Sequence, residues 1–165
     1  LSFTAEEMWA AMPAIARDAD SVHLSSWYVE NPEFINAELD SKWDKIIKLR
    51  KEVNKVLEKA RQGENRIIGN SLDAEVSLFI GNDEYKSLLA DKELLEMIFI
   101  ISKLNIVETK DDSFTESEEL KDISIKVAHA TGEKCERCWK YSEELGTHEE
   151  HSTICPRCTG VLVNN

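Results

Sequence analysis

Four cysteines near the end of this sequence are the residues whose types and spacing could do chemistry. They form two Cys-x-x-Cys pairs, Cys135 with Cys138 and Cys155 with Cys158, separated by sixteen residues. Such a turn can aim two thiolates at one point, and two facing pairs surround Zn²⁺ as a tetrahedron. Because the fourth thiolate fills the position that a catalytic zinc leaves open for water, we predict one structural Zn²⁺ and no catalytic residue.

Other uses of these cysteines fit the sequence less well. Disulfides suit secreted chains, but nothing here resembles a signal peptide. A thioredoxin-like redox centre needs only one Cys-x-x-Cys pair. His129, His148 and His151 are close enough in sequence to replace a cysteine, but four thiolates already saturate the metal. We expect these histidines to be ordinary surface or turn residues, and the sequence assigns them no other role.

The charge of the chain restricts its partners. Its net charge is -12, from 20 Lys and Arg against 32 Asp and Glu. Such a balance argues against indiscriminate binding to nucleic acid or anionic membranes, so a polyanion must meet a local patch. The longest apolar run, Met97–Ile101, is too short to cross a bilayer, and the cytoplasm is the expected location. The first residue is Leu1, which indicates a piece of a longer chain.

The first part of the chain is predicted to be helical. Thr4 and Glu7 have the spacing of a capping box for a short helix that ends near Pro13. Met8, Trp9 and Met12 lie on one face of that helix and are expected in the core. An irregular connection over 17–35 follows. A long helix is predicted from about Asn36 to Gln62, and the residues expected on its buried face are Leu39, Trp43, Ile46, Arg50, Val53, Leu57 and Ala60.

The opposite face of the long helix is basic. It collects Lys48, Lys51, Lys55 and Lys59. Residues 42–66 contain nine Lys or Arg and four Asp or Glu, so the stretch is +5 inside an acidic protein. This face is either simply solvated or a stripe that meets phosphates, and the spacing alone leaves both interpretations open.

The remaining chain alternates strand and helix signals. A strand over 75–80, helical spacing over 83–102 and a strand over 105–109 predict a parallel pair with a right-handed crossover. An acidic loop over 108–122, interpreted as solvated and mobile, leads to a third strand over 123–127. The predicted fold class is therefore α+β. Its three domains are a helical segment over 1–66, a small α/β unit over 67–129 and a zinc-binding module over 130–165.

Several motifs together carry a resemblance to a known family. They are Phe3–Trp9, Ser21–Leu24, Leu49–Asn54, Ile68–Val76, Gly132–Tyr141 and Ile154–Cys158. In this order they resemble the C-terminal region of bacterial isoleucyl-tRNA synthetase, a class I enzyme that joins isoleucine to its tRNA at the expense of ATP. The resemblance implies that 1–66 completes the helical anticodon-binding domain. The His-Ile-Gly-His and Lys-Met-Ser-Lys-Ser motifs of that family do not occur here, so ATP, Mg²⁺ and isoleucine sites are expected outside this piece, which should not aminoacylate alone.

The resemblance implies an isoleucine-accepting tRNA as the partner, bound at its anticodon stem-loop. Unpaired RNA bases are recognised by stacking on aromatic rings or guanidinium planes and by hydrogen bonds to base edges. We expect Trp139 to stack on a loop base and Arg137 to contact a base edge or phosphate, beside Lys134 and Lys140. Alternatively, Trp139 packs over the zinc and the basic residues offset the charge of Zn(Cys)₄. The four lysines of the helix would contact phosphates without reading sequence.

Two other functions compete with this interpretation. A DNA glycosylase of the formamidopyrimidine type has similar cysteine spacing, but its finger carries an arginine before the second pair, where this chain has residues 151–154 without one. A zinc-stabilised module that binds only protein would also suit the acidic surface. The parent enzyme is expected to be monomeric, whereas self-association of the piece stays open. Residue chemistry alone does not choose the amino acid.

Overall fold

The computed structural model describes residues 1–64 and 66–163, and these form two compact units, Leu1–Ala37 and Glu38–Asn165. Helices and two small sheets occur together, so the predicted α+β class is confirmed. The division at residues 66 and 129 stays a prediction. Within the described residues no helix is long and apolar enough to cross a membrane.

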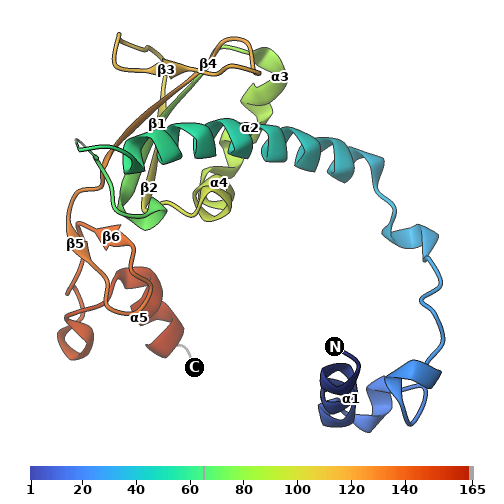
Figure 1. Ribbon diagram of the computed structural model, residues 1–165. Helices are drawn as coiled ribbons and strands as arrows, with labels where there is room; N and C mark the ends of the chain where they lie inside the picture. The colour runs from blue at the N-terminus through green and yellow to red at the C-terminus, as the bar shows by residue number, and fades with distance from the viewer. Residues whose placement is uncertain (65, 164–165) are drawn as a thin grey trace. The chain divides into compact units, whose positions relative to one another are not determined.

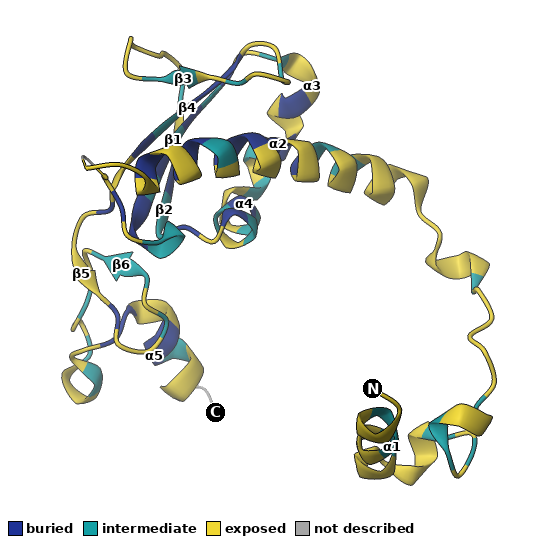
Figure 2. Ribbon diagram, viewed as in Figure 1, coloured by how far each residue is buried: buried dark blue, intermediate teal, exposed yellow. Residues whose placement is uncertain are grey.

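The first unit is a chain of short helices without a buried core. It contains α1 (Ser2–Ala11) and the 3-10 turns η1 (Ala14–Ala16), η2 (Val22–Leu24) and η3 (Pro32–Phe34). The predicted capping box is wrong, because α1 begins before Thr4 and its first turn has no side-chain cap. The core assignment of α1 is wrong for Met8 and Met12, which are 68% and 38% exposed, because α1 packs here mainly on η2 rather than on a second layer. Trp9 is partly buried, and its indole N–H donates to the Ala19 carbonyl at 2.9 Å. Figure 2 shows this unit mostly in the exposed colour, with some residues of intermediate exposure and none buried.

Helix α2 (Ala37–Arg61) confirms the long helix and belongs to the second unit. Its buried residues are Ile46, Leu49, Glu52, Val53, Val56, Leu57 and Ala60. The expected placement of Leu39, Trp43 and Arg50 is wrong, because all three are exposed. The buried face is rotated toward Leu49 and Val56, and only the later part of the helix meets the core (Figure 2). The apolar pattern gave the helix its correct length but not its correct orientation.

A four-stranded sheet forms the centre of the second unit (Figure 1). The strands are β1 (Ala74–Ile80), β2 (Lys103–Val107), β3 (Thr115–Glu116) and β4 (Ile123–His129), in the order β2-β1-β4-β3. β1 and β2 are parallel, as predicted, whereas β4 runs antiparallel to both β1 and β3. The parallel pair is connected through α3 (Asp83–Lys86), η5 (Ser87–Asp91) and α4 (Lys92–Phe99). The alternating burial of β1 matches a strand with one face on the core.

The acidic loop is mostly exposed to solvent, as predicted, but it is also anchored to α2. Glu52 of α2, 2% exposed, accepts hydrogen bonds from the Ser117 hydroxyl at 2.5 Å and from the backbone N–H groups of Glu118 at 2.8 Å and Glu119 at 3.3 Å. Lys55 Nζ lies 2.7 Å from the second oxygen of Glu52. Burial raises the pKa of Glu52, but the bonds from Lys55 and the loop outweigh it and lower the pKa to about 2.

The last part of the chain is built around short elements. β5 (Glu133–Lys134) pairs antiparallel with β6 (Tyr141–Ser142), and η6 (Glu149–His151) leads to α5 (Pro156–Val163). Gly132 precedes β5 with φ +90°, and a Cβ there would lie 2.3 Å from the Ser142 carbonyl oxygen, so only glycine fits. Another 3-10 turn, η4 (Ser71–Asp73), precedes β1 and lies near this hairpin, because Lys134 Nζ is 3.9 Å from Asp73 Oδ1.

Candidate metal centre and nucleic-acid surface

The two cysteine pairs converge on one point. The Sγ atoms of Cys135, Cys138, Cys155 and Cys158 all lie within 4.8 Å of one another. All four cysteines are free thiols, which excludes the disulfide alternative. Cys138 Sγ and Cys155 Sγ are 3.7 Å apart, and sulfurs about 2.3 Å from a central Zn²⁺ would be about 3.8 Å from one another. The donor set and its spacing therefore fit a tetrahedral zinc site with no open position.

Local backbone structure positions both pairs. The first pair occupies the turn between β5 and β6, where the Trp139 N–H donates to the Cys135 carbonyl and the Cys135 N–H to the Lys140 carbonyl, each at 2.9 Å. The second pair brackets the start of α5, with Pro156 at its first residue. Proline suits that position because it lacks an N–H that would go unpaired there. Each knuckle is thus fixed by a turn rather than by apolar packing.

The pKa values of the thiols shift in different directions, although the four sulfurs lie close together. Burial disfavours the Cys135 thiolate, but backbone N–H groups of Cys138, Cys155 and Arg137 lower the pKa of Cys135 to about 6. Burial and the neighbouring sulfurs raise the pKa of Cys138 to about 12. Several thiolates cannot share so small a volume unless a cation neutralises them, and Zn²⁺ supplies that charge. The cluster is thus arranged to hold a cation.

Trp139 and Arg137 are presented outward by the first knuckle. Trp139 is 61% exposed, although it lies next to a metal ligand, and its backbone has φ +65°. A non-glycine residue in this left-handed region is uncommon, and the tight turn holds it there. Arg137 is also exposed. Lys134 Nζ lies 5.8 Å from the Trp139 ring centroid and 6.0 Å from that of Tyr141, so a cation sits against both rings.

The four lysines of α2 fall into two classes. Lys55 forms ion pairs with Glu52, with Glu119 at 2.8 Å and with Glu118 at 3.5 Å, while Lys59 lies 3.6 Å from Glu118. Among the described residues no ion pair engages Lys48 or Lys51. The anchored acidic loop therefore partly neutralises one end of the basic face and leaves the other end available.

The histidines lie outside the group of side chains that could bind the metal. His129 packs edge-on against Tyr141, with ring centroids 4.9 Å apart, and His148 stacks on His151 at 5.4 Å. The metal-ligand group found in the described part of the chain contains cysteines alone.

Sequence reasoning missed two features of the site region. The predicted basic face assigns no role to Glu52, which is buried and anchors the acidic loop. Arg157, inside the second Cys-x-x-Cys pair, was left without a role. It lines a groove together with Lys140 and residues of α4.

Comparisons with known protein families match two parts of the chain. Residues 1–78 match the family described as the anticodon-binding domain of tRNA ligase, and residues 132–159 match the zinc finger found in FPG and IleRS. The second match, together with the cysteine geometry, shows a zinc-binding module.

Isoleucine–tRNA ligases from several bacteria match almost the whole of this chain. The isoleucine–tRNA ligase of Desulforamulus reducens is 42% identical over 164 residues, which are 98% of this chain and 17% of that protein. The ligase of Syntrophotalea carbinolica is 40% identical over 165 residues, 99% of this chain and 17% of the relative. The ligase of Geobacter sulfurreducens is 40% identical over 162 residues, again 98% and 17%. The chain thus spans about a sixth of their length, and the resemblance seen in its motifs is confirmed.

Proposed function

Because the chain matches isoleucine–tRNA ligases along almost its whole length, we propose that it is the C-terminal, tRNA-binding part of such a ligase. Its role is to bind the anticodon stem-loop of an isoleucine-accepting tRNA while the rest of the parent attaches isoleucine in an ATP-dependent reaction. ATP and Mg²⁺ then belong to the rest of the parent. The parent acts as a monomer in the cytoplasm, where translation takes place.

The observation that carries this proposal is the exposed side chain of Trp139, on the turn that holds the first cysteine pair. Removing an apolar ring from water is favourable, so a largely exposed Trp139 beside a buried cysteine calls for a partner. An unpaired RNA base provides a flat apolar face, and stacking of this kind contributes roughly 1 to 3 kcal/mol per base. Arg137 on the same turn supplies a guanidinium for a base edge or phosphate. The exposure of Trp139 favours stacking over the alternative in which the ring covers the zinc.

One structural Zn²⁺ fixes this turn. The four thiolates hold the two knuckles together through the metal. Lys134 and Lys140 add positive charge beside Trp139, and Lys48 and Lys51 on α2 provide further phosphate contacts. Lys55 and Lys59 contribute less, because carboxylates already face them. The net charge of -12 is no obstacle, since binding depends on these local groups.

The test is tRNA charging by the complete ligase with Trp139→Ala. We expect kcat/KM for tRNA to fall about tenfold or more, with zinc content unchanged. Phe114→Ala is the matched control, because Phe114 is also a partly exposed ring with a lysine, Lys126, 5.7 Å from its centroid. Unaltered tRNA kinetics in Trp139→Ala with zinc bound would reject the stacking role.

Nucleic-acid binding assays distinguish this function from the two competing ones. A glycosylase-type finger would bind a damaged DNA duplex, and a protein-binding module would bind neither nucleic acid. We expect the zinc-loaded chain to bind an isoleucine tRNA stem-loop and to leave the DNA unbound at the same salt concentration. The match to ligases over nearly the whole chain, rather than over the zinc module alone, favours this outcome.

A further inference from the structure

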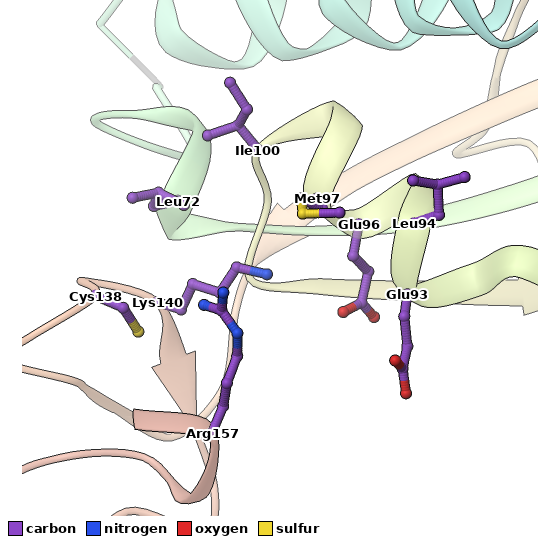
Figure 3. A pocket seen from close by; sticks show the side chains of 9 residues that line it. All are labelled: Leu72, Glu93, Leu94, Glu96, Met97, Ile100, Cys138, Lys140 and Arg157. Atoms are coloured by element: carbon purple, nitrogen blue, oxygen red, sulfur yellow. The ribbon is translucent and has the colours of Figure 1, made fainter. Parts of the chain in front are cut away.

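A groove separates the zinc module from helix α4 within the second unit. Its volume is about 800 Å³, which lies in the range of small-molecule sites. Figure 3 shows Lys140 and Arg157 entering it from the zinc module, and Glu93 and Glu96 entering it from α4. Its apolar lining, here called the floor, consists of Leu72, Leu94, Met97 and Ile100. Met97 is 60% exposed, so this floor is open to a ligand.

The basic side chains on one wall of the groove, from the zinc module, form no ion pairs with the acidic side chains on the other wall, from α4, within the described residues. Within the described residues no ion pair joins Lys140 or Arg157 to Glu93 or Glu96. Glu96 accepts a hydrogen bond from the Leu104 N–H at 3.0 Å, which ties its carboxylate to β2. The Glu93 side chain has no hydrogen bond or ion pair in the part of the chain that the structure describes. The groove therefore offers two unpaired cations on one side, an unpaired carboxylate on the other and an apolar surface between them.

The residue that ends α4, Ile100, lines this floor and has a backbone conformation that is unfavourable for a β-branched residue. Ile100 follows the helix with φ +57° and ψ +51°, and its N–H caps the carbonyls of Glu96 and Met97. Glycine is the usual residue at such a left-handed helix end, and a β-branched residue there is a clear outlier. A strained residue that lines a groove suggests that its side chain is needed there.

We propose that this groove binds one unpaired nucleotide of the tRNA whose base carries an amino group. The apolar floor takes the face of the base, Arg157 and Lys140 take its phosphate, and the Glu93 carboxylate accepts hydrogen bonds from the base edge. Guanine, cytosine and adenine each present an amino donor, whereas uracil flanks its single N–H with two carbonyl oxygens that the carboxylate repels. The groove thereby adds base discrimination to the stacking contact of Trp139.

This inference rests on the proposed function, because it needs the same RNA. Cys138 belongs both to the first knuckle and to the groove lining, so one RNA loop can contact Trp139 and the groove together. A mixed-charge groove is also suited to a protein segment, but cations grouped on one wall match a phosphate, and the exposed knuckle beside it matches further unpaired bases.

The experiment measures binding of the zinc-loaded chain to an isoleucine tRNA anticodon stem-loop by fluorescence anisotropy. Each loop nucleotide is exchanged in turn between an amino-bearing base and uridine. At one position uridine should weaken binding about tenfold. In Glu93→Gln this discrimination should disappear, whereas Glu108→Gln, the same change at an exposed glutamate outside the groove, should retain it.

Two further variants probe the phosphate and the floor. Arg157→Gln should weaken all RNAs alike and lower the salt slope by about one, unlike Lys121→Gln, which removes an equal charge elsewhere. Ile100→Gly should reduce affinity about tenfold while leaving the melting temperature no lower, because glycine relieves the left-handed backbone.

The outcomes separate the two proposals. If Glu93→Gln keeps full discrimination or Ile100→Gly binds like the parent chain, while Trp139→Ala still weakens binding, the groove is not a nucleotide site and the proposed function stands. If the unaltered chain does not bind the stem-loop, both proposals fail. Loss of discrimination in Glu93→Gln together with reduced affinity in Ile100→Gly supports the groove.

Discussion

The sheet region and the zinc module of the second unit are held together in different ways. The sheet and α2 share one continuous apolar core, in which Leu78, Leu95 and Leu104 are wholly buried. Among the described residues, the buried cluster of the module contains three cysteines and one aliphatic side chain, Ile154, with Leu145 packed against it. An apolar core of that size cannot offset the ordering of some thirty residues, so the module depends on its metal whereas the sheet does not.

Removal of zinc should have the largest effect, and only on the module. Structural zinc contributes about 10 to 16 kcal/mol in small metal-dependent folds. After chelation we expect amide signals of β5, β6 and α5 to collapse toward random-coil positions in heteronuclear NMR, while those of β1 and β4 keep their dispersion. Loss of both sets would mean that the sheet also relies on the metal.

A cavity in the sheet core should produce the converse result. Leu104→Ala removes a wholly buried side chain from β2 and is expected to destabilise the sheet region by roughly 2 to 5 kcal/mol. Urea unfolding measures the change, and zinc titration of the folded variant should still give saturating binding. Ile106→Ala, at an exposed position of the same strand, is the control and should cost far less.

Acid should loosen the sheet region through Glu52. Its pKa in the folded chain is about 2, below the ordinary 4.5, so folding favours the carboxylate. The stabilisation is present above about pH 4.5 and is lost as the pH falls toward 2, a difference of roughly 3 kcal/mol. Glu52→Gln should flatten that part of the stability profile measured by urea unfolding, whereas Glu58→Gln, at an exposed carboxylate paired with Arg61, should leave it in place.

The junction between the two regions should give the smallest effect. The Ser102 hydroxyl accepts a hydrogen bond from the Tyr141 N–H at 2.7 Å and so ties β6 to the start of β2. Ser102→Ala should lower the unfolding free energy by about 1 kcal/mol. Thermal melts of the zinc-loaded chain followed at both regions will show whether they then unfold separately. An unchanged melt would make this bond irrelevant to their coupling.

Local patterns predicted the elements well because they depend on neighbouring residues. The cysteine spacing led to the metal site, and the strand–helix–strand order led to the parallel pair. The orientation of α2 could not be predicted, because Leu49 and Val56 share their core with residues far away in the sequence. The anchoring of the acidic loop was equally hidden, since it depends on one carboxylate, Glu52, about sixty-five positions earlier in the chain.

The groove illustrates the same limit. Glu93 and Arg157 are sixty-four positions apart in the sequence, and neither belongs to a recognisable motif with the other. Their common position depends on how the zinc module sits on α4. The exposed core candidates of α1 fail for a related reason: the apolar spacing was right for a helix face, but the described unit provides no layer to cover it.

The loop that Glu52 fastens onto α2 changes how ionic strength should act on the basic helix. Lys55 and Lys59 have fixed carboxylates as their counterions instead of mobile salt ions. A phosphate that approaches them displaces part of the protein itself, so little entropy is gained from freed cations or anions of the buffer. The salt dependence of RNA binding should therefore depend on Lys48 and Lys51 and hardly on Lys55 and Lys59.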